Sequence, residues 1–316
     1  MSTPPWTRGP IVVLGAEGML GCDLTKLLRE RLSDPDGERV RSWDVAAGAR
    51  MDSRTDMDSR TDIRDRKAVI AAICRLRPVV VVNCAAYTDV DGCESHQDLA
   101  TAVNVAGVEN VADACRDVDA LMVHIGTDFI FDGRSRRPYQ PADGANPLSV
   151  YGRSKWEGEE ALRASGCRYL LVRTSWLFGP HGRNFVETIL DKAEAGQPLS
   201  VVTDQVGRPT LTIDLSEGIL RLLDRGAEGT FHFANSGQCS WFEFTEAIVR
   251  HAGVDVPIRP ITSDKLSRPA CRPAYSVLDL TAYTERTGHV PALWTDALGR
   301  YFVVRTPRKV MQRERA

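Results

Sequence analysis

The sequence predicts an α/β protein with a doubly wound parallel sheet and a smaller C-terminal substrate-binding cap. Three observations lead to this prediction. Short apolar runs alternate with helical patterns over the first 175 residues, a glycine-rich turn follows the first apolar run, and the pattern becomes irregular after residue 175. Near-continuous Val, Ile and Leu runs are typical of parallel strands, because helices cover both faces of such a sheet.

The predicted strands follow one another along the chain. IVVLG (11–15) is interpreted as a buried strand, and RVRSWD (39–44) as the next one. The leucines between them lie on one face of a predicted helix, at Leu20, Leu24, Leu27 and Leu28. The remaining strands are predicted at VVVVN (79–83), LMVHIGT (121–127) and YLLVRT (169–174).

The turn after the first strand is a candidate dinucleotide site. GAEGMLG (15–21) places Gly15, Gly18 and Gly21 between the strand and the amphipathic helix. Glycines at such a turn allow the backbone to approach a pyrophosphate, and the helix N-terminus offers free N–H groups to the anion. The spacing is G-x-x-G-x-x-G, but the order of strand, glycines and helix indicates a Rossmann-type fold that binds NAD(P).

The sequence leaves the choice between NADH and NADPH open. Asp44 ends the second predicted strand and would hydrogen-bond a ribose 2′-OH, which favours NADH. Arg41, Arg50 and Arg54 lie close by in the sequence and would accommodate a 2′-phosphate instead. Both reduced cofactors are therefore retained.

Two unequal domains are expected. Residues 1–175 should form the NAD(P)-binding domain, and residues 176–316 should form mainly the smaller substrate-binding domain. We also expect the sheet core to receive some later segments. No Gly/Ser-rich linker marks the boundary, so the cap should pack directly on the sheet domain.

Composition narrows the classes of partner. The 316 residues carry a net charge of −2, which gives no indication of a nucleic-acid or anionic-membrane partner. No segment approaches the roughly 20 apolar residues of a membrane span, and the Pro-rich start MSTPPWTRGP does not resemble a signal peptide. The eight cysteines show no C-x-x-C spacing and are interpreted as reduced thiols. These features predict a cytoplasmic protein.

A tandem repeat interrupts the region after the second strand. MDSRTD occurs at 51–56 and again at 57–62. Its polar composition favours a duplicated surface loop, which a fold tolerates at little thermodynamic cost.

A tyrosine and a lysine stand one helical turn apart in YGRSK, at Tyr151 and Lys155. Residues four apart share one face of a helix, so the ammonium would lower the pKa of the phenol from its reference value of about 10. Tyr151 would then exchange a proton near neutral pH. Because the pattern is short and both residues are common, an ordinary surface helix start is the alternative.

Together these features resemble the extended short-chain dehydrogenase/reductase superfamily. Its catalytic site combines a Tyr-x-x-x-Lys pair with an upstream Ser or Thr, and IGTD (125–128) supplies Thr127 for that position. By this resemblance Thr127, Tyr151 and Lys155 form the catalytic set.

A narrower resemblance covers roughly residues 10–302. Its motifs in chain order are VVNCAAYTDVDGCES, GTDFIFDG, NPLSVYGRSKWEGE, VRTSWLFGPHGRNFV, DQVGRPT, GTFHFANSGQCSWFEF and RPAYSVLDL. The chain thereby resembles the dTDP-4-dehydrorhamnose reductase family. The resemblance implies NAD(P)H-dependent reduction of the 4-keto group of a dTDP-4-dehydro-6-deoxy-L-hexose, which converts dTDP-4-dehydrorhamnose to dTDP-L-rhamnose.

The resemblance also assigns roles to the catalytic set. Tyr151 would protonate the alkoxide that forms at C4 of the sugar. Lys155 would lower the pKa of Tyr151 and hold the nicotinamide ribose, and Thr127 would hydrogen-bond the keto oxygen and polarise it.

Further candidates surround the cofactor and the sugar nucleotide. The cofactor candidates, which include the glycine turn, are Gly15, Glu17, Gly18, Met19, Leu20, Asp44, Asp62, Ile63, Ala85, Ala86, Tyr87 and Asn104. The substrate candidates are Thr88, Val90, Phe129, Trp176, Asn184, Gln205, Arg208, Arg268 and Arg272. Arginines suit the diphosphate end of the substrate because a planar guanidinium binds phosphate oxygens in pairs. For each arginine, a simple exposed position is the alternative.

No metal ligand is assigned. His124 and His232 lie in apolar runs and are interpreted as core or edge histidines, and no His, Cys, Asp or Glu cluster has metal-ligand spacing. Some reductases of the family use Mg²⁺ at a dimer interface, so Mg²⁺ is a possible cofactor by this resemblance, although no acidic ligands are matched to it and metal dependence stays open. A monomer or a homodimer is expected.

Two departures from related families leave alternatives open. Sugar-nucleotide 4,6-dehydratases have Thr-Asp-Glu where this chain has Thr127-Asp128-Phe129, and the missing Glu favours reduction over elimination. The reductases usually have Tyr in place of Phe129, so a reductase of a different dTDP-4-keto-deoxysugar of secondary metabolism is one alternative. A non-catalytic NADP-binding regulatory subunit is the other.

Overall fold

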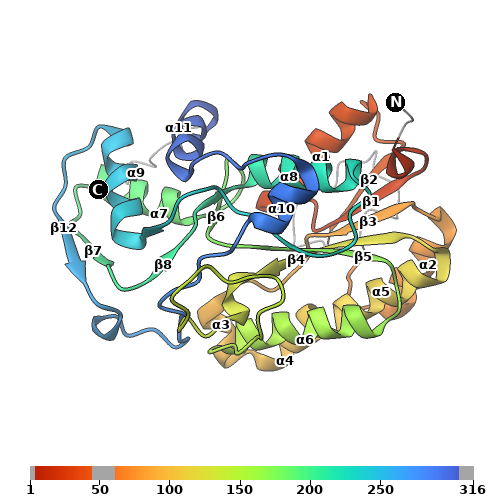
Figure 1. The fold of residues 1–316 in the computed structure, drawn as a ribbon, viewed down its shortest axis with the longest axis horizontal. Helices are drawn as coiled ribbons and strands as arrows, with labels where there is room; N and C mark the ends of the chain where they lie inside the picture. Colours follow the sequence, from red (N-terminus) through yellow and green to blue (C-terminus); the bar gives the residue numbers. More distant parts are fainter. Residues whose placement is uncertain (1–3, 45–60, 306–316) are drawn as a thin grey trace, which may run out of the picture.

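The computed structural model of the protein describes residues 4–44 and 61–305, and a six-stranded sheet in the order β10-β5-β4-β3-β1-β2 forms its centre (Figure 1). Every neighbouring pair in this sheet is parallel. The strands are β1 (Ile11–Leu14), β2 (Val40–Trp43), β3 (Val80–Asn83), β4 (Leu121–Thr127), β5 (Tyr169–Thr174) and β10 (Gly229–His232). The predicted strands and the doubly wound parallel sheet are therefore confirmed.

The strand order places a switch point beside the first strand. β1 pairs with β2 on one side and with β3 on the other. The chain therefore adds β2 on one side of β1 and then crosses over to add β3 on the other side. In sheets of this type, ligands bind outside the carboxyl ends of the strands at such a point. The topology thus locates the candidate site before any side chain is considered.

Helices cover both faces of the sheet (Figure 1). One face packs against α1 (Met19–Leu32), α8 (Thr212–Asp224) and α10 (Thr281–Thr287). The other packs against α2 (Arg66–Leu76), α5 (Gly107–Val118) and α6 (Val150–Ala164). The short helices α3 (Val90–Ser95) and α4 (Gln97–Thr101) and the π-helix η3 (Ala102–Ala106) connect β3 to α5.

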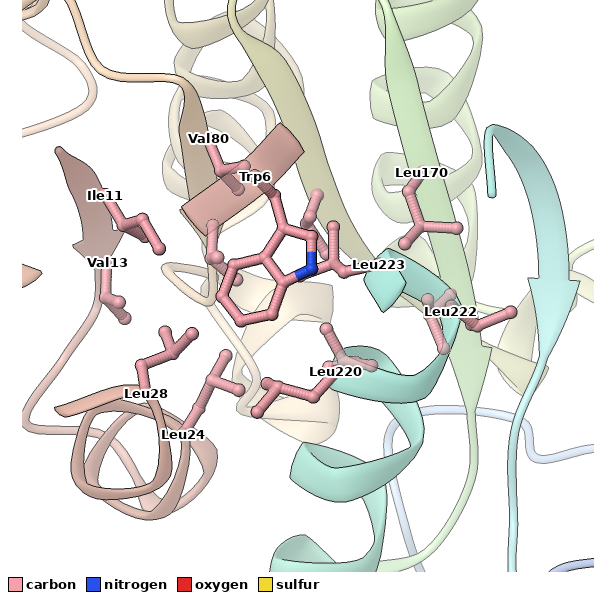
Figure 2. Packing of buried hydrophobic residues seen from close by; sticks show 14 of the residues in the cluster. Trp6, Ile11, Val13, Leu24, Leu28, Val80, Leu170, Leu220, Leu222 and Leu223 are labelled. Carbon is pink, nitrogen blue, oxygen red and sulfur yellow. The ribbon is translucent and has the colours of Figure 1, made fainter. Parts of the chain in front are cut away.

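The N-terminal segment closes one of these cores, which its polar, Pro-rich composition did not suggest. Trp6, in the 3-10 turn η1 (Pro5–Thr7), is buried among Leu24 and Leu28 of α1 and Leu220 and Leu223 of α8 (Figure 2). Its indole Nε1 donates a hydrogen bond to the carboxylate of Asp224 at 3.2 Å. The indole therefore joins the two helices on this face of the sheet.

The later part of the chain builds a second, separate core. Its helices are α7 (Phe185–Glu194), α9 (Trp241–Ala252) and α11 (Trp294–Val304). Its short strands pair as β6 (Leu177–Phe178) with β9 (Thr210–Leu211), β7 (Leu199–Val202) with β12 (Ile258–Ile261), and β8 (Val206–Gly207) with β11 (Cys239–Ser240). Two further 3-10 turns are η4 (Asp128–Ile130), directly after β4, and η5 (Ser263–Lys265), after β12. Later segments also return to the sheet, as β10 and α8.

The structure also bears on the tandem repeat, the cysteines and the search for membrane-spanning helices. Residues 51–60 of the tandem repeat lie outside the described residues. All eight cysteines are free, and four of them, including Cys93 and Cys115, are buried. No helix in the described ranges 4–44 and 61–305 is both long and apolar enough to cross a membrane.

Candidate active site at the carboxyl edge of the sheet

The glycine turn after β1 brings two backbones into close contact. Gly15 adopts φ +71°, and a Cβ built on it would lie 2.6 Å from the backbone N of Ala85. A Cβ on Gly21 would lie 2.1 Å from the carbonyl oxygen of Gly15. Gly18 occupies the N-cap of α1, where no side chain caps the helix. The turn is thus a cradle that side chains would fill, and it leaves the helix N-terminus open to an anion such as the pyrophosphate of NAD(P).

This turn forms one side of a cavity of about 510 Å³. Of the predicted cofactor residues, those that line it are Gly15, Gly18, Met19, Leu20, Ala85 and Ala86. All three predicted catalytic residues, Thr127, Tyr151 and Lys155, line the same cavity. The structure therefore brings the glycine turn and the catalytic set together, although more than a hundred residues separate Gly21 from Thr127 in the sequence.

The start of α6 positions Tyr151. Ser149 is the N-cap, and its side chain accepts a hydrogen bond from the N–H of Gly152 at 3.1 Å. This cap places Tyr151 in the first turn of the helix and Lys155 in the second, with both side chains buried. A Cβ on Gly152 would lie 2.3 Å from the carbonyl oxygen of Phe129, so the helix start packs closely on the segment after β4.

Burial sets the charge states of this pair. Burial raises the pKa of Tyr151, opposed by a side-chain hydrogen bond with Thr127. Burial lowers the pKa of Lys155 to about 8, while the charge of Glu159 raises it. The Lys155 ammonium donates a hydrogen bond to the carbonyl oxygen of Ile125 at 2.7 Å. The net shift of the Tyr151 pKa is therefore upward, whereas the sequence predicted a downward shift, because desolvation of the phenolate dominates.

Asp128 adds a buried carboxyl next to the catalytic set. One of its oxygens accepts a hydrogen bond from the hydroxyl of Thr127 at 3.3 Å, and the other accepts one from Ser276 at 2.5 Å. Burial raises the pKa of Asp128 to about 7, although these hydrogen bonds act in the opposite direction. The carboxyl is therefore divided between its protonated and ionised forms near neutral pH.

Aromatic side chains connect this cavity to a larger one of about 660 Å³. Phe129 and Trp176 line both cavities, and Trp241 stacks on Trp176 with ring centroids 3.6 Å apart. Trp176 has a strained φ of 49° and lies against Gly207, where a Cβ would be 2.4 Å from the indole. Phe129 meets Tyr151 edge-on at 5.5 Å, so the position where related reductases carry Tyr lies beside the predicted acid.

Predicted substrate residues gather mainly at these cavities. Thr88 and Val90 line the smaller cavity, Gln205 and Arg268 line the larger one, and Arg272 lines both. Both Arg268 and Arg272 donate hydrogen bonds to Asp91 of α3. Arg268 nevertheless exposes 54% of its side chain, whereas Arg272 exposes 19%.

Arg208 is not among the residues that line either cavity, but one hydrogen-bond donor of its guanidinium has no partner in the described part of the chain. Burial lowers the pKa of its guanidinium, and its Nε has no hydrogen-bond partner among residues 4–44 and 61–305. A half-buried cation with an unused donor fits an anion-binding role.

Other predicted residues have structural contacts that account for their side chains. Asn184 caps α7 and donates to the carbonyl oxygen of Gly179 at 2.9 Å, and it lies outside both cavities. Asn104 bonds both the N–H and the carbonyl of Tyr87, which holds the loop after β3. Ile63 is buried in the core.

The remaining cofactor candidates lie beside the glycine turn or near the surface. Asp44 accepts a hydrogen bond from the N–H of Glu17 at 2.8 Å, and Asp62 is paired with Arg64. Arg50 and Arg54, which left the choice of cofactor open, lie outside the described residues.

Sequence reasoning missed three residues of the site. Trp241 and Ser276 come from distant segments, and Asp91 anchors two of the predicted arginines. Asp128 stands out in the sequence only as part of the Thr127-Asp128-Phe129 run. Its position directly after a Thr that ends a buried strand was the available signal. The other three lie inside the quoted family motifs, but nothing in those motifs singles them out as site residues.

The histidine predictions agree with the structure. His124 and His232 are fully buried, and burial is the main reason that the pKa of each falls below its usual value. Within the described part of the chain, no group of three or more His, Cys, Asp or Glu residues is arranged to hold a metal ion.

Fold and site together define a Rossmann-type protein of the short-chain dehydrogenase/reductase class. Its markers are the parallel sheet, the glycine turn after β1 and the Tyr-x-x-x-Lys helix that borders the same cavity. The family model described as RmlD substrate binding domain matches residues 9–305. The chain belongs to this family, that of the dTDP-4-dehydrorhamnose reductases.

Individual relatives agree with this assignment. The dTDP-4-keto-6-deoxy-D-glucose reductase of Streptomyces niveus is 38% identical over 297 residues, which cover 92% of this chain and 96% of the relative. The dTDP-4-dehydrorhamnose reductase of Mycobacterium tuberculosis is 37% identical over 278 residues, covering 85% and 84%. Among solved structures, the dTDP-4-dehydrorhamnose reductase of Bacillus anthracis in complex with NADP has a TM-score of 0.84 and 32% identity, covering 94% and 99%.

Proposed function

We propose that this protein is an NAD(P)H-dependent reductase of the 4-keto group of dTDP-4-dehydro-6-deoxy-L-hexose, forming dTDP-L-rhamnose from dTDP-4-dehydrorhamnose. The observation that carries the proposal is the meeting of Thr127, Tyr151 and Lys155 with the glycine turn around one cavity. The family membership and the reactions named for its relatives support the choice of substrate.

The glycine turn fits the cofactor. Gly15, Gly18 and the open N-terminus of α1 would hold the pyrophosphate, and Lys155 would hold the nicotinamide ribose. When bound, NADPH or NADH supplies the hydride that reaches C4 of the sugar. Asp44 lies at the position that selects between the two cofactors, after β2 and beside the turn.

The protein residues handle the proton and the developing charge. Tyr151, whose raised pKa keeps it protonated at neutral pH, donates its proton to the oxygen on C4 as that oxygen becomes an alkoxide. Thr127 hydrogen-bonds the same oxygen and stabilises the negative charge. Because Tyr151 is buried, little solvent competes for this charge.

The larger cavity would hold the nucleotide end of the substrate. Trp176 and Trp241 provide flat apolar surfaces suited to a base. Gln205, Arg208, Arg268 and Arg272 would neutralise the diphosphate. In this arrangement the Asp91 carboxylate holds Arg268 and Arg272 in place before substrate binds.

A second candidate is a reductase of a different dTDP-4-keto-deoxysugar. Phe129 favours it, because a phenyl ring at the wall shared by both cavities leaves a substrate hydroxyl without the partner that a tyrosine would offer. The relative named as a dTDP-4-keto-6-deoxy-D-glucose reductase gives this candidate further support.

Assembly and location belong to the same proposal. Residues 1–175, with β10 and α8, would form the cofactor-binding domain, and most of residues 176–316 the domain that binds the sugar nucleotide. We expect a monomer or homodimer in the cytoplasm that works without nucleic acid or membrane. The net charge of −2 is consistent with this expectation.

The test is NADH and NADPH oxidation, followed at the nicotinamide absorbance, with dTDP-4-dehydro-L-rhamnose generated in situ. Rapid oxidation with formation of dTDP-L-rhamnose is the expected result. Oxidation only with another member of a keto-sugar panel would select the second candidate. Tight cofactor binding with no oxidation across the panel would overturn both candidates and favour a regulatory subunit.

A further inference from the structure

A row of hydroxyl and carboxyl groups connects the predicted acid to the far side of the site. The Thr127 side chain is near enough to Tyr151 to lower the pKa of its phenol, Thr127 donates a hydrogen bond to Asp128, and Ser276 donates one to the other oxygen of Asp128. These groups come from α6, from the end of β4, and from the C-terminal segment 148 residues further along the chain.

The two ends of this row face different cavities. Tyr151, Thr127 and Asp128 line the smaller cavity with the glycine turn, whereas Ser276 lines the larger cavity. Asp128 and Ser276 are themselves almost fully buried. The carboxyl of Asp128 therefore stands between the catalytic cavity and the larger one, and hydrogen-bonded hydroxyls flank it on both sides.

We propose that Asp128 is the proton donor that reloads Tyr151 after each reduction, acting through the hydroxyl of Thr127. The inference rests on the proposed function and deepens it. After Tyr151 gives its proton to the C4 alkoxide, the phenolate takes a proton from the hydroxyl of Thr127. That hydroxyl takes one from the Asp128 carboxyl, which becomes a carboxylate and regains a proton from solvent by way of Ser276.

The Thr127 hydroxyl donates to Asp128 in the structure, so the transfer requires this bond to reverse: the protonated Asp128 carboxyl donates to the Thr127 oxygen, and the Thr127 hydroxyl turns to Tyr151. The Thr127 oxygen accepts from the N–H of Phe129 at 3.2 Å, which fixes its position while leaving its own proton for a neighbour. Ser276 donates to the Asp128 oxygen that Thr127 does not use, and so stabilises the carboxylate left after transfer.

The charged surroundings allow the carboxyl to be protonated at working pH. Tyr151 of α6 faces Asp128, and Lys155 of α6 and Arg272 of the C-terminal segment line the same cavity. Burial raises the pKa of Asp128 to about 7, so a proton is available below that pH and absent above it. Turnover should therefore fall as pH rises through neutrality.

The first test is single- and multiple-turnover oxidation of NADPH with the keto sugar by wild type, Asp128→Asn and the control Asp132→Asn. Asp132 is a nearby aspartate that binds Tyr139 and Asn146 and lies outside both cavities. In Asp128→Asn the first equivalent of NADPH should be oxidised at close to the wild-type rate, because Tyr151 still carries its own proton. Later turnovers should slow by at least about tenfold, whereas Asp132→Asn should match wild type.

Two results of this test would overturn the inference while the proposed function stands. One is steady-state turnover of Asp128→Asn within about twofold of wild type, since general acids contribute far more than that. The other is a first turnover slowed as much as the later ones, which is the result of a merely structural role. Absence of wild-type turnover with every keto sugar would instead overturn the proposed function, and the inference with it.

Ser276→Ala gives a second test that does not depend on Asp128→Asn folding. Loss of the Ser276 hydrogen bond should raise the pKa of Asp128 and move the alkaline fall of kcat upward by about one pH unit. Infrared titration of the ligand-free protein should show a protonated carboxyl that ionises near neutrality, with the same shift in Ser276→Ala. An unmoved alkaline limb, or no carboxyl titrating near neutrality, would sink the proposal.

Discussion

At the scale of single residues, the site contains groups whose pKa values burial has shifted from their ordinary values. The phenol of Tyr151, the ammonium of Lys155 and the carboxyl of Asp128 are all buried, and burial is the largest influence on each pKa. Such perturbed groups are typical of catalytic sites, where proton transfer requires them. The raised pKa of Asp128 also reduces stability near neutral pH, because its ionised carboxylate is buried away from water without a partner charge.

Asp128→Asn should stabilise the folded protein at alkaline pH. The pKa of Asp128 is raised from 3.8 to about 7. Its contribution to stability is therefore fully present below about pH 4 and is lost as pH rises through about 7. At pH 8 the substitution should recover up to about 4 kcal/mol of unfolding free energy, and much less at pH 5.

Urea unfolding of wild type and Asp128→Asn at these two pH values checks this prediction. Asp132→Asn again serves as the control, because hydrogen bonds, first from the N–H of Arg134, lower the pKa of Asp132. An Asp128→Asn variant that is equally destabilised at both pH values would contradict the prediction.

Tyr151→Phe should abolish most turnover without weakening cofactor binding. The phenol supplies the proton, so its loss should lower kcat by about 100-fold or more. The edge-on contact between the two rings should survive the substitution, because Phe129 meets the ring of Tyr151 rather than its hydroxyl. Steady-state kinetics and NADPH titration by fluorescence separate the two effects. Near-normal kcat would refute the assigned acid.

At the scale of elements, α6 is held to the sheet by a buried ion pair. Glu159 lies one turn beyond Lys155, and its carboxylate accepts hydrogen bonds from Arg173 of β5, at 2.8 Å for the shortest. Both side chains are almost fully buried. The charge of Glu159 also raises the pKa of Lys155. Glu159 therefore has two effects: it holds α6 to β5 through Arg173, and it favours the charged form of Lys155.

Glu159→Gln should destabilise the protein by about 3–5 kcal/mol, because it leaves the guanidinium of Arg173 buried without its counter-charge. Glu160→Gln is the matched control on the same helix. Glu160 pairs with Arg163 at the surface, with 54% of its side chain exposed. Its loss should cost less than about 1 kcal/mol. Denaturant unfolding of both variants measures the loss of unfolding free energy. Equal losses in the two variants would show that the buried ion pair of Glu159 with Arg173 does not hold α6 to the sheet.

At the scale of the whole molecule, two cores meet across the site, and polar contacts link them. One such contact joins Asp91 of α3 to Arg268 and Arg272 of the segment before α10. Burial alone would raise the pKa of Asp91, but hydrogen bonds from Arg272, the N–H of Ala270 and Arg268 lower it to about 2. The contact connects the cofactor side of the site to the segment that carries Ser276.

Asp91→Asn should loosen this segment and weaken substrate binding. Because the pKa of Asp91 is lowered, its stabilisation is present above about pH 4 and is lost as pH falls towards 2. Solvent screening limits the effect to about 1 kcal/mol. Wild type should thus exceed Asp91→Asn in stability at pH 7 but not at pH 2.

Hydrogen exchange in residues 263–276 and the KM for the sugar nucleotide test the local consequence of Asp91→Asn. Exchange should become faster, and KM should rise because Arg268 and Arg272 lose their anchor. Asp89→Asn is a control on the same loop, since Asp89 caps α3 and does not contact these arginines. Unchanged exchange and unchanged KM in Asp91→Asn would show that the contact has no organising role.

Local residue patterns were enough to predict five of the six strands of the central sheet, the first helix and two sides of the site. Val and Ile runs predicted the strands, the leucines after Gly18 predicted α1, and the glycine turn and YGRSK predicted opposite borders of the smaller cavity. These predictions succeeded because strand burial, helix periodicity and tight turns arise from neighbours within a few residues.

The way these parts act together depends on contacts that form only in the folded chain. Folding pairs Asp128 with Ser276 and Asp91 with Arg272, at separations of 148 and 181 residues, and it stacks Trp241 on Trp176. It also reverses the expected direction of the Tyr151 pKa shift. The physical reason is the same in each case. Desolvation and long-range contacts depend on how two separately formed cores dock, and no local residue pattern encodes that arrangement.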